Sequence, residues 1–133
     1  MKFTLDTAKG ILIHSCQQGQ VVLKVPNEEP GKPPVEDIWS SSLILGHGDR
    51  AVNWHALDIL QLTREHFELV WQIHPDIVLL GTGQKLNFPD ISIREMFGIE
   101  GIGLEVMDTG AACRTYNVLT AEGRNVMAYL VVD

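Results

Sequence analysis

Two glycine-containing segments carry the residue types that could do chemistry. The first is "GTG", residues 81–83, which follows an apolar run, and the second is "DTGAACR", residues 108–114. A glycine turn between a strand and a helix can hold the phosphates of a nucleotide, because the free amides of the helix face the anion. The first question is therefore whether residues 81–83 form a phosphate site or serve another purpose.

The glycine turn matches neither common phosphate-binding motif. A dinucleotide-binding turn needs a third glycine three residues after the second, and that position holds Leu86. A P-loop needs Gly-Lys followed by Ser or Thr, and Lys85 has neither the spacing nor the following hydroxyl. Pro89 also disfavours a helix directly after the turn. We therefore expect no nucleotide cofactor, and the turn is either a simple chain reversal or the edge of a polar site.

The segment that begins at Asp108 is predicted to form a helix. Asp108 or Thr109 suits the N-cap, and Gly123 suits a left-handed residue that closes the helix. At about 100° per residue, one face of this helix is expected to lie on a sheet. The residues of that face are Ala111, Ala112, Thr115, Tyr116, Val118 and Leu119.

The opposite face of the same helix carries Cys113, Arg114 and Asn117. Such a face usually contacts only water, and Asp108 as the N-cap already occupies amides that could bind an anion. Against this, a thiol, a guanidinium and a carboxamide lie near a helix start, which can lower a thiol pKa. No motif links a histidine base to Cys113, so we expect no thiol catalysis. The face is either a solvated surface or one wall of a site.

The elements that must position these residues alternate between strands and helices. A hairpin over residues 11–25 comes first, and a proline-rich connection at 26–34 follows it. Predicted strands at 41–46, 76–81, 101–107 and 125–132 then alternate with helices that start at Thr63, Ile93 and Asp108. This order predicts largely parallel strands, with the hairpin added to the sheet or packed on it. The carboxyl ends of parallel strands share one edge, so "GTG" and "DTGAACR" are expected to be neighbours.

Composition and charge narrow the class of protein. The 133 residues carry a net charge of −7 without a block of Lys and Arg, which disfavours nucleic acid as a partner. The first residues lack a signal-peptide pattern and no apolar run is long enough to span a membrane, so we expect a cytoplasmic protein without membrane insertion. Two cysteines match no disulfide framework and are expected to be free thiols. His47, Asp49 and His55 have no metal-binding spacing, so no metal is expected.

The segments "LLGTGQKLNFP" and "GIGLEVMDTGAACRTYNVLTAEGRNVMAYLV" resemble a small family of unknown function. This family includes the adipogenesis-associated Mth-domain protein and mitochondrial respiratory complex I assembly factor 3. The resemblance implies a three-layer α/β domain on a central mixed, largely parallel five-stranded sheet, with one strand antiparallel to the others and no established catalytic activity. It also implies a surface pocket, formed here by Gly81, Thr82, Gly83, Asp108, Thr109, Cys113, Arg114, Thr115 and Asn117. The mitochondrial relative acts by protein contact during assembly, and this chain is expected to differ from it in lacking a presequence.

Three functional hypotheses follow. We expect residues 1–133 to form a single α/β domain that acts as a non-enzymatic binding or assembly protein with a protein partner and without a cofactor. The alternative is a small-molecule enzyme or anionic-ligand binder, in which Arg114 attracts the anion and Asp108 orients it. In the third hypothesis the polar helix face only stabilises the fold, because Asp108 caps the helix and Arg114 pairs with a nearby acid.

Overall fold

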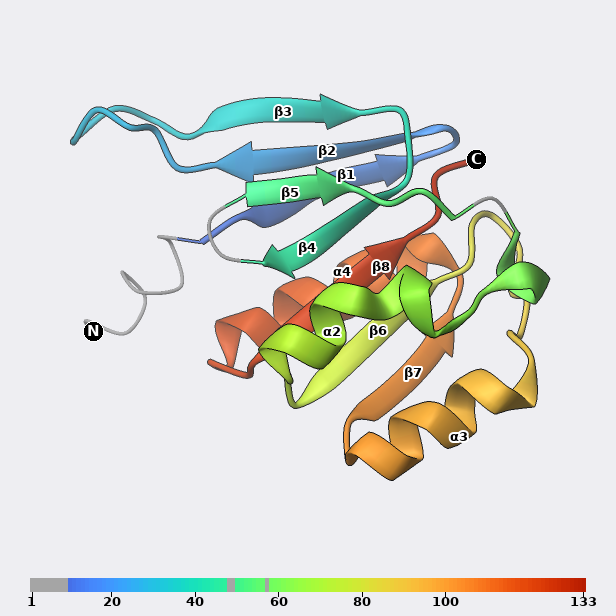
Figure 1. Cartoon of the computed structure of the whole chain (residues 1–133). Helices are drawn as coiled ribbons and strands as arrows, with labels where there is room; N and C mark the ends of the chain where they lie inside the picture. The colour runs from blue at the N-terminus through green and yellow to red at the C-terminus, as the bar shows by residue number, and fades with distance from the viewer. Residues whose placement is uncertain (1–9, 48–49, 57) are drawn as a thin grey trace.

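Backbone hydrogen bonds join the strands into two sheets (Figure 1). The computed structural model describes residues 10–47, 50–56 and 58–133. The larger sheet has five strands in the order β5-β4-β8-β6-β7. Their bounds are β4 (Leu43–His47), β5 (Arg50–Asn53), β6 (Ile77–Gly81), β7 (Gly103–Met107) and β8 (Val126–Leu130).

The central sheet is mixed in the way that the resemblance implies. β6 pairs in parallel with β7 on one side and with β8 on the other, and Gly81 aligns with both Met107 and Leu130. β4 is antiparallel to β8 and to β5, so it alone of these five strands runs against the others. The carboxyl ends of β6, β7 and β8 therefore lie on one edge of the sheet, and the predicted fold class is confirmed.

Alternating side chains of the sheet build two cores, one on each face. On one face, Leu80 and Tyr129 pack with Phe67 and Phe97, which belong to the helical segments on that side. On the other face, Leu79 and its neighbours pack with the last helix and with the N-terminal sheet. Figure 1 shows these helices covering opposite faces of the sheet, which gives the three layers.

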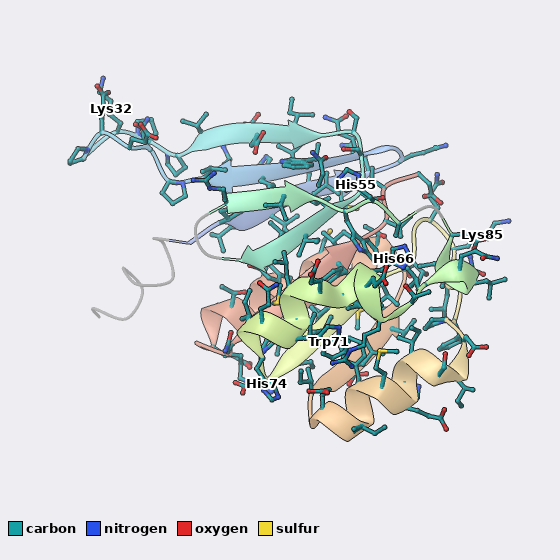
Figure 2. All side chains as sticks on the ribbon, viewed as in Figure 1. Lys32, His55, His66, Trp71, His74 and Lys85 are labelled. Atoms are coloured by element: carbon teal, nitrogen blue, oxygen red, sulfur yellow. The ribbon has the colours of Figure 1, made fainter. Side chains whose placement is uncertain are left out.

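Aspartate side chains cap the starts of three helices, at Asp58, Asp90 and Asp108. Their bounds are η1 (Ile59–Gln61), η2 (Arg64–Phe67), α2 (Glu68–Ile73), α3 (Ile91–Glu100) and α4 (Thr109–Ala121). Thr63 precedes η2 as predicted, and α2 is followed by His74, labelled in Figure 2, which adopts a left-handed conformation directly before Pro75. α3 is longer than the predicted 93–97, because the Asp90 carboxylate accepts a hydrogen bond from the Ser92 amide and so starts the helix earlier.

The N-terminal segment forms its own antiparallel sheet in the order β1-β2-β3. The predicted hairpin is confirmed as β1 (Leu12–Gln17) and β2 (Gln20–Val25). Two strands, β3 (Val35–Trp39) and β5, have no counterpart among the elements predicted from the sequence. β3 escapes pattern recognition because both of its faces are largely exposed, so no apolar alternation marks it. β5 has only four residues.

The Asn117 carboxamide joins the N-terminal sheet to α4. Its Oδ1 accepts a hydrogen bond of 2.9 Å from the Ile13 amide, and its Nδ2 donates one of 2.7 Å to the Ile13 carbonyl. β1 is an edge strand, so the carboxamide takes the place that a further strand would fill. Asn117 therefore has a structural role at this contact.

The orientation predicted for α4 is wrong in part. Its buried residues are Thr109, Ala112, Cys113 and Tyr116, whereas Val118 is 56% exposed. The cause is the contact with β1, because α4 packs against that strand as well as against the central sheet. This second contact moves the buried stripe toward Cys113, which the periodicity of one helix cannot reveal.

None of the helices in the described ranges combines the length and apolar character that crossing a membrane requires.

Replacing Asn117 by Leu is expected to lower the free energy of unfolding by roughly 1–3 kcal/mol, because an Ile13 amide and carbonyl lose their partners. Urea unfolding measures this change. Val118→Ala on the exposed side of the same helix is the matched control and is expected to have a small effect. Equal midpoints for Asn117→Leu and the control would contradict the role of the carboxamide.

The buried Tyr129 makes stability depend on alkaline pH. Burial raises the pKa of Tyr129 above its ordinary value of 10.0. Above that ordinary value the unfolded chain loses the phenolic proton while the folded chain keeps it, so the free energy of unfolding falls as pH rises. Urea unfolding at pH values below and above 10 should show a smaller fall in Tyr129→Phe than in the wild type. An equal fall in both proteins would show that Tyr129 titrates alike in the folded and unfolded states.

Candidate functional site

Two chain reversals meet at the carboxyl edge of the central sheet. The first is the glycine turn at 81–83 after β6, and the second is Asp108-Thr109 between β7 and α4. The Thr109 amide donates a hydrogen bond of 2.9 Å to the Gly83 carbonyl. The Gly83 amide donates one of 2.8 Å to the Thr109 hydroxyl oxygen, Oγ1. The parallel pairing of β6 and β7 thus brings the two segments into direct contact.

The Thr109 hydroxyl links three parts of the chain. It accepts from Gly83, and it donates a hydrogen bond of 2.6 Å to the carbonyl of Val131, just after β8. The Val131 amide in turn donates to the Gly81 carbonyl at 2.9 Å. The Thr109 side chain is buried, so each of these groups depends on the protein for its partner.

The turn has no space for a side chain at position 81 or 83. A Cβ atom on Gly81 would lie 3.0 Å from the Cα atom of Thr109, and one on Gly83 would lie 2.5 Å from a carboxylate oxygen of Asp133. Gly83 also has a φ of +100°, which other residues rarely adopt. The turn therefore uses glycine to let α4 and the chain after β8 approach the strand end.

The donors of the turn already face protein acceptors. The Gln84 amide donates to the Asp133 carboxylate at 3.0 Å, and the Gln84 side chain donates to the Asp133 carbonyl at 2.9 Å. A phosphate at this position would have to displace a carboxylate of the chain itself. The geometry supports the close packing of backbone segments and not a phosphate cradle.

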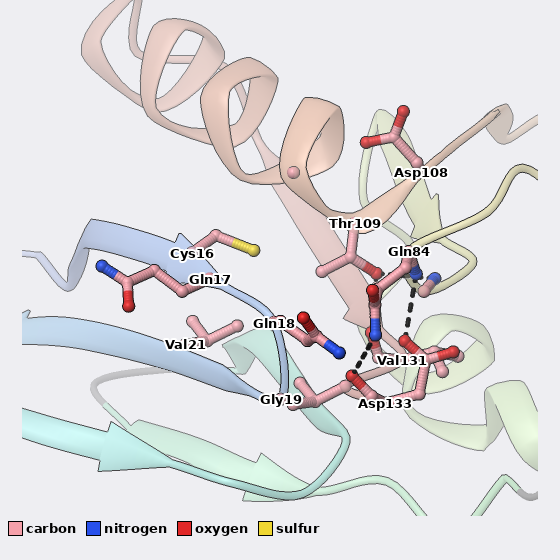
Figure 3. Close-up of a pocket in the computed structure, with 13 residues that line it drawn as sticks. Cys16, Gln17, Gln18, Gly19, Val21, Gln84, Asp108, Thr109, Val131 and Asp133 are labelled. Atoms are coloured by element: carbon pink, nitrogen blue, oxygen red, sulfur yellow. Dashed lines mark hydrogen bonds between the residues drawn. The ribbon is translucent and has the colours of Figure 1, made fainter.

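Beside this contact the structure has a cavity of about 300 Å³ (Figure 3). It lies between the turn that joins β1 to β2, the glycine turn, the start of α4 and the chain after β8. Its lining residues are Cys16, Gln17, Gln18, Gly19, Val21, Gly83, Gln84, Asp108, Thr109, Gly110, Val131, Val132 and Asp133. The size is that of a small ligand pocket.

The charge of this cavity is negative. Asp108 and Asp133 line it, whereas no lysine or arginine occurs among the described residues of its wall. The Asp108 carboxylate also accepts a hydrogen bond of 2.9 Å from the Ala111 amide and so caps α4. Two carboxylates without a cation disfavour an anionic ligand, because bringing like charges together costs free energy.

A smaller cavity of about 170 Å³ lies beside the larger one, between β1 and α4. Cys113, Arg114 and Asn117 line this second cavity together with residues of β1, and Cys16 and Gly110 line both. Arg114, which the alternative hypothesis used to attract an anion, is therefore absent from the wall of the larger cavity.

The pocket residues that the resemblance implied do not all line one cavity. Gly83, Asp108 and Thr109 line the larger cavity, and Cys113, Arg114 and Asn117 line the smaller one. Gly81, Thr82 and Thr115 line neither. The Thr115 hydroxyl donates to the Ala111 carbonyl within α4, so it serves the helix. Whether any of these residues binds a ligand stays a prediction.

The β1–β2 turn is absent from the site predicted from the sequence. Gln17 at the end of β1 and Gln18 of the turn line the larger cavity, as does Asp133. The sequence placed the hairpin correctly, but nothing in a local pattern indicates that its turn lies beside a glycine turn more than sixty residues away. The polar character of the turn is the only signal that could have suggested a surface role.

Cys113 is poorly suited to attack a substrate from solution. Burial raises its pKa well above the ordinary thiol range, and the neighbouring Cys16 thiol raises it further, while Arg114 opposes the shift. Little of the reactive thiolate is therefore present at neutral pH, and the buried sulfur is shielded from solution. Both cysteines are free, as the sequence analysis expected.

The histidines do not gather into a metal site in the part of the chain that the structure describes. No group of three or more His, Cys, Asp or Glu side chains there could hold a metal ion. Asp49 and the side chain of His47 lie outside the described residues, so the segment considered for a metal is described only in part.

Comparison with known proteins gives this chain a family. The family described as protein of unknown function (DUF498/DUF598) matches residues 13–131. The solved structure of a protein from Xanthomonas campestris covers 92% of this chain and 85% of its own length, with a TM-score of 0.74 and 32% sequence identity.

Two curated relatives carry informative names. NADH dehydrogenase (ubiquinone) 1 alpha subcomplex assembly factor 3 of Mus musculus is 37% identical over 82 residues, which is 60% of this chain and 44% of the relative. A 13 kDa major membrane protein of Francisella tularensis subsp. holarctica is 34% identical over 74 residues, which is 56% of this chain and 60% of the relative. The matches thus span about half the length of these relatives. The cytoplasmic location stays a prediction.

The family match covers both chain reversals, the last three strands and α4. The relatives include the assembly factor that the sequence analysis named as a family member. The resemblance is confirmed, and the chain belongs to the DUF498/DUF598 family of proteins of unknown function.

Proposed function

We propose that this chain is a non-catalytic assembly factor that holds a protein partner during the building of an NADH dehydrogenase-type respiratory complex. The observation that carries the proposal is the similarity to a mammalian protein named as an assembly factor of that enzyme. The geometry of the site supports a protein whose function is to present a stable surface.

Three polar side chains of the candidate site, those of Thr82, Asp108 and Thr109, are engaged in holding the fold. The Thr109 hydroxyl both accepts and donates a hydrogen bond, and the Asp108 carboxylate caps α4. The Thr82 hydroxyl donates to the Lys85 carbonyl at 2.7 Å and accepts from the Asn87 amide at 3.0 Å. A catalytic group needs a free donor or acceptor for its substrate. These side chains instead define the shape of the surface around them.

The segment after the glycine turn presents apolar side chains to solvent. Leu86 is 50% exposed, Phe88 is 59% exposed and Ile91, the first residue of α3, is 69% exposed. Neighbouring large apolar residues on a surface mark a contact site for another protein, and an aromatic residue is a common anchor. We call Leu86, Phe88 and Ile91 the apolar segment.

The apolar segment is held in place from both ends. Thr82, which is only 3% exposed, binds the backbone of Lys85 and Asn87 through its hydroxyl. Asp90 caps α3 and fixes the position of Ile91. A preorganised segment loses little conformational entropy when a partner binds. Thr82, which lines neither cavity, thus supports the proposed contact surface.

The negative charge of the chain favours a partner with a positively charged surface. The net charge is −7, and the cavity at the same edge of the sheet carries Asp108 and Asp133. A partner surface with lysine or arginine around an apolar centre fits this arrangement, because complementary charges speed association.

Phe88→Ala is expected to reduce recovery of the partner. The test is a pull-down with the tagged chain from its native host, followed by quantitative mass spectrometry of NADH dehydrogenase subunits. Truncating an aromatic anchor costs about 2 kcal/mol or more, which corresponds to roughly a thirtyfold loss in affinity. Ile99→Ala is the matched control, because Ile99 is 85% exposed near the other end of α3.

Two results would contradict this proposal. Recovery of no NADH dehydrogenase subunit with the wild-type chain would argue against the assembly role. Equal recovery with Phe88→Ala and with Ile99→Ala would remove the apolar segment from the contact.

A further inference from the structure

The two cysteines come from distant parts of the sequence and share one cavity. Cys16 lies near the end of β1, and Cys113 lies in the first half of α4. Both line the cavity of about 170 Å³ between these elements. Cys113 is 3% exposed and Cys16 is half-buried against the same core.

An irregularity in β1 places Cys16 on the inner side. The pairing with β2 shifts between Ile13 and Ser15, so Ile13 aligns with Leu23 and Cys16 aligns with Val21. Leu23 and Val21 are two residues apart and both buried, so they point to the same face. In a regular strand, residues three positions apart, such as Ile13 and Cys16, would point to opposite faces. The extra residue in β1 places both on the same face.

The same face of α4 is fixed to β1. Asn117 binds both backbone groups of Ile13, and Cys113 lies four residues earlier, one helical turn away on the same side. Cα atoms of α4 and β1 approach within 8 Å of each other. A disulfide needs a Cα separation of about 4.4–6.8 Å, and the shared cavity places the two thiols on facing sides of these neighbouring elements.

We propose that Cys16 and Cys113 are a modification site at which a reversible disulfide joins β1 to α4. Cys16 is the residue that meets the oxidant, because it is half-buried and also lines the larger cavity. Figure 3 shows its sulfur atom pointing into the space between β1 and the start of α4. Cys113 completes the bridge from the interior.

The chemistry is two thiol–disulfide exchanges with a small-molecule disulfide such as oxidised glutathione. In the first, the Cys16 sulfur attacks one glutathione sulfur, the glutathione S–S bond breaks, and the leaving glutathione takes the thiol proton. In the second, Cys113 gives its proton to water, its thiolate attacks the Cys16 sulfur of the mixed disulfide, and the second glutathione leaves as a thiolate that takes up a proton. The protein dithiol is oxidised by two electrons, and the glutathione disulfide is reduced to two thiols.

Cys113 reacts in the second step because its thiol is buried. Burial raises its pKa most, and the adjacent Cys16 thiol adds to the shift, so Cys113 stays protonated and shielded from reagents in solution. Once Cys16 is part of a mixed disulfide it can no longer carry a charge, and one cause of the raised pKa is removed. The bridge then draws the β1–β2 turn toward α4 and narrows the larger cavity, of which Cys16 and Gly110 are wall residues.

The test uses the full chain, incubated in glutathione buffers with an increasing oxidised fraction. Mass spectrometry of the intact wild-type protein should show a monomer that has lost two hydrogen atoms, and peptide mapping without reductant should find Cys16 linked to Cys113. Dithiothreitol should restore the original mass. Under the same buffers Cys113→Ala should accumulate one glutathione on Cys16, whereas Cys16→Ser should stay unmodified.

Three results would overturn the proposal. The first is a wild-type protein that retains glutathione on Cys16 without forming the bridge. The second is a wild-type protein that stays fully reduced in buffers that modify Cys113→Ala. The third is a bridge found only between two chains. If Cys113→Ala fails to fold, the peptide map of the wild type decides alone, because presence or absence of the Cys16–Cys113 link needs no variant.

Discussion

The hydrogen bonds of one buried hydroxyl organise the carboxyl edge of this protein. Thr109 Oγ1 accepts from the Gly83 amide and donates to the Val131 carbonyl, so it ties the turn after β6, the start of α4 and the chain after β8 to one point. Gly83 and Thr109 are buried and Val131 is partly buried, so these groups depend on one another for hydrogen-bond partners. The glycines at 81 and 83 follow from this constraint, because a side chain at either position would collide with Thr109 or Asp133.

The cavities follow from the same arrangement. With the strand ends held together, the β1–β2 turn closes the space beside α4 and leaves an acidic cavity lined by Asp108 and Asp133. Asn117 fixes the other end of that contact by pairing with Ile13. Thr109 and Asn117 thus hold layers together, and the apolar segment that follows the turn stays exposed. This division suits a protein that binds and releases partners better than one that transforms a substrate.

The sequence predicted the elements whose signal is local. β6 was recognisable as an unbroken apolar run, and Asp108 and Gly123 marked the ends of α4 by their capping chemistry. β3 was missed because solvent on both of its faces leaves no apolar alternation to read. The buried side of α4 was predicted only in part, because Cys113 and Asn117 face a strand about one hundred residues earlier in the chain. Contacts of that kind depend on the tertiary arrangement and leave no periodic pattern in either segment.

The central claim is that residues 81–83 and Thr109 form a permanent structural contact and not a ligand cradle. Amide hydrogen exchange at Gly83 tests it most directly, since this N–H is bound to a buried hydroxyl in the chain itself. We expect protection comparable to that of the β6 amides in the ligand-free protein, and faster exchange in Thr109→Val than in Thr109→Ser, which retains the hydroxyl. Rapid exchange at Gly83 in the ligand-free wild type, with protection gained only on addition of a phosphate compound, would contradict the account.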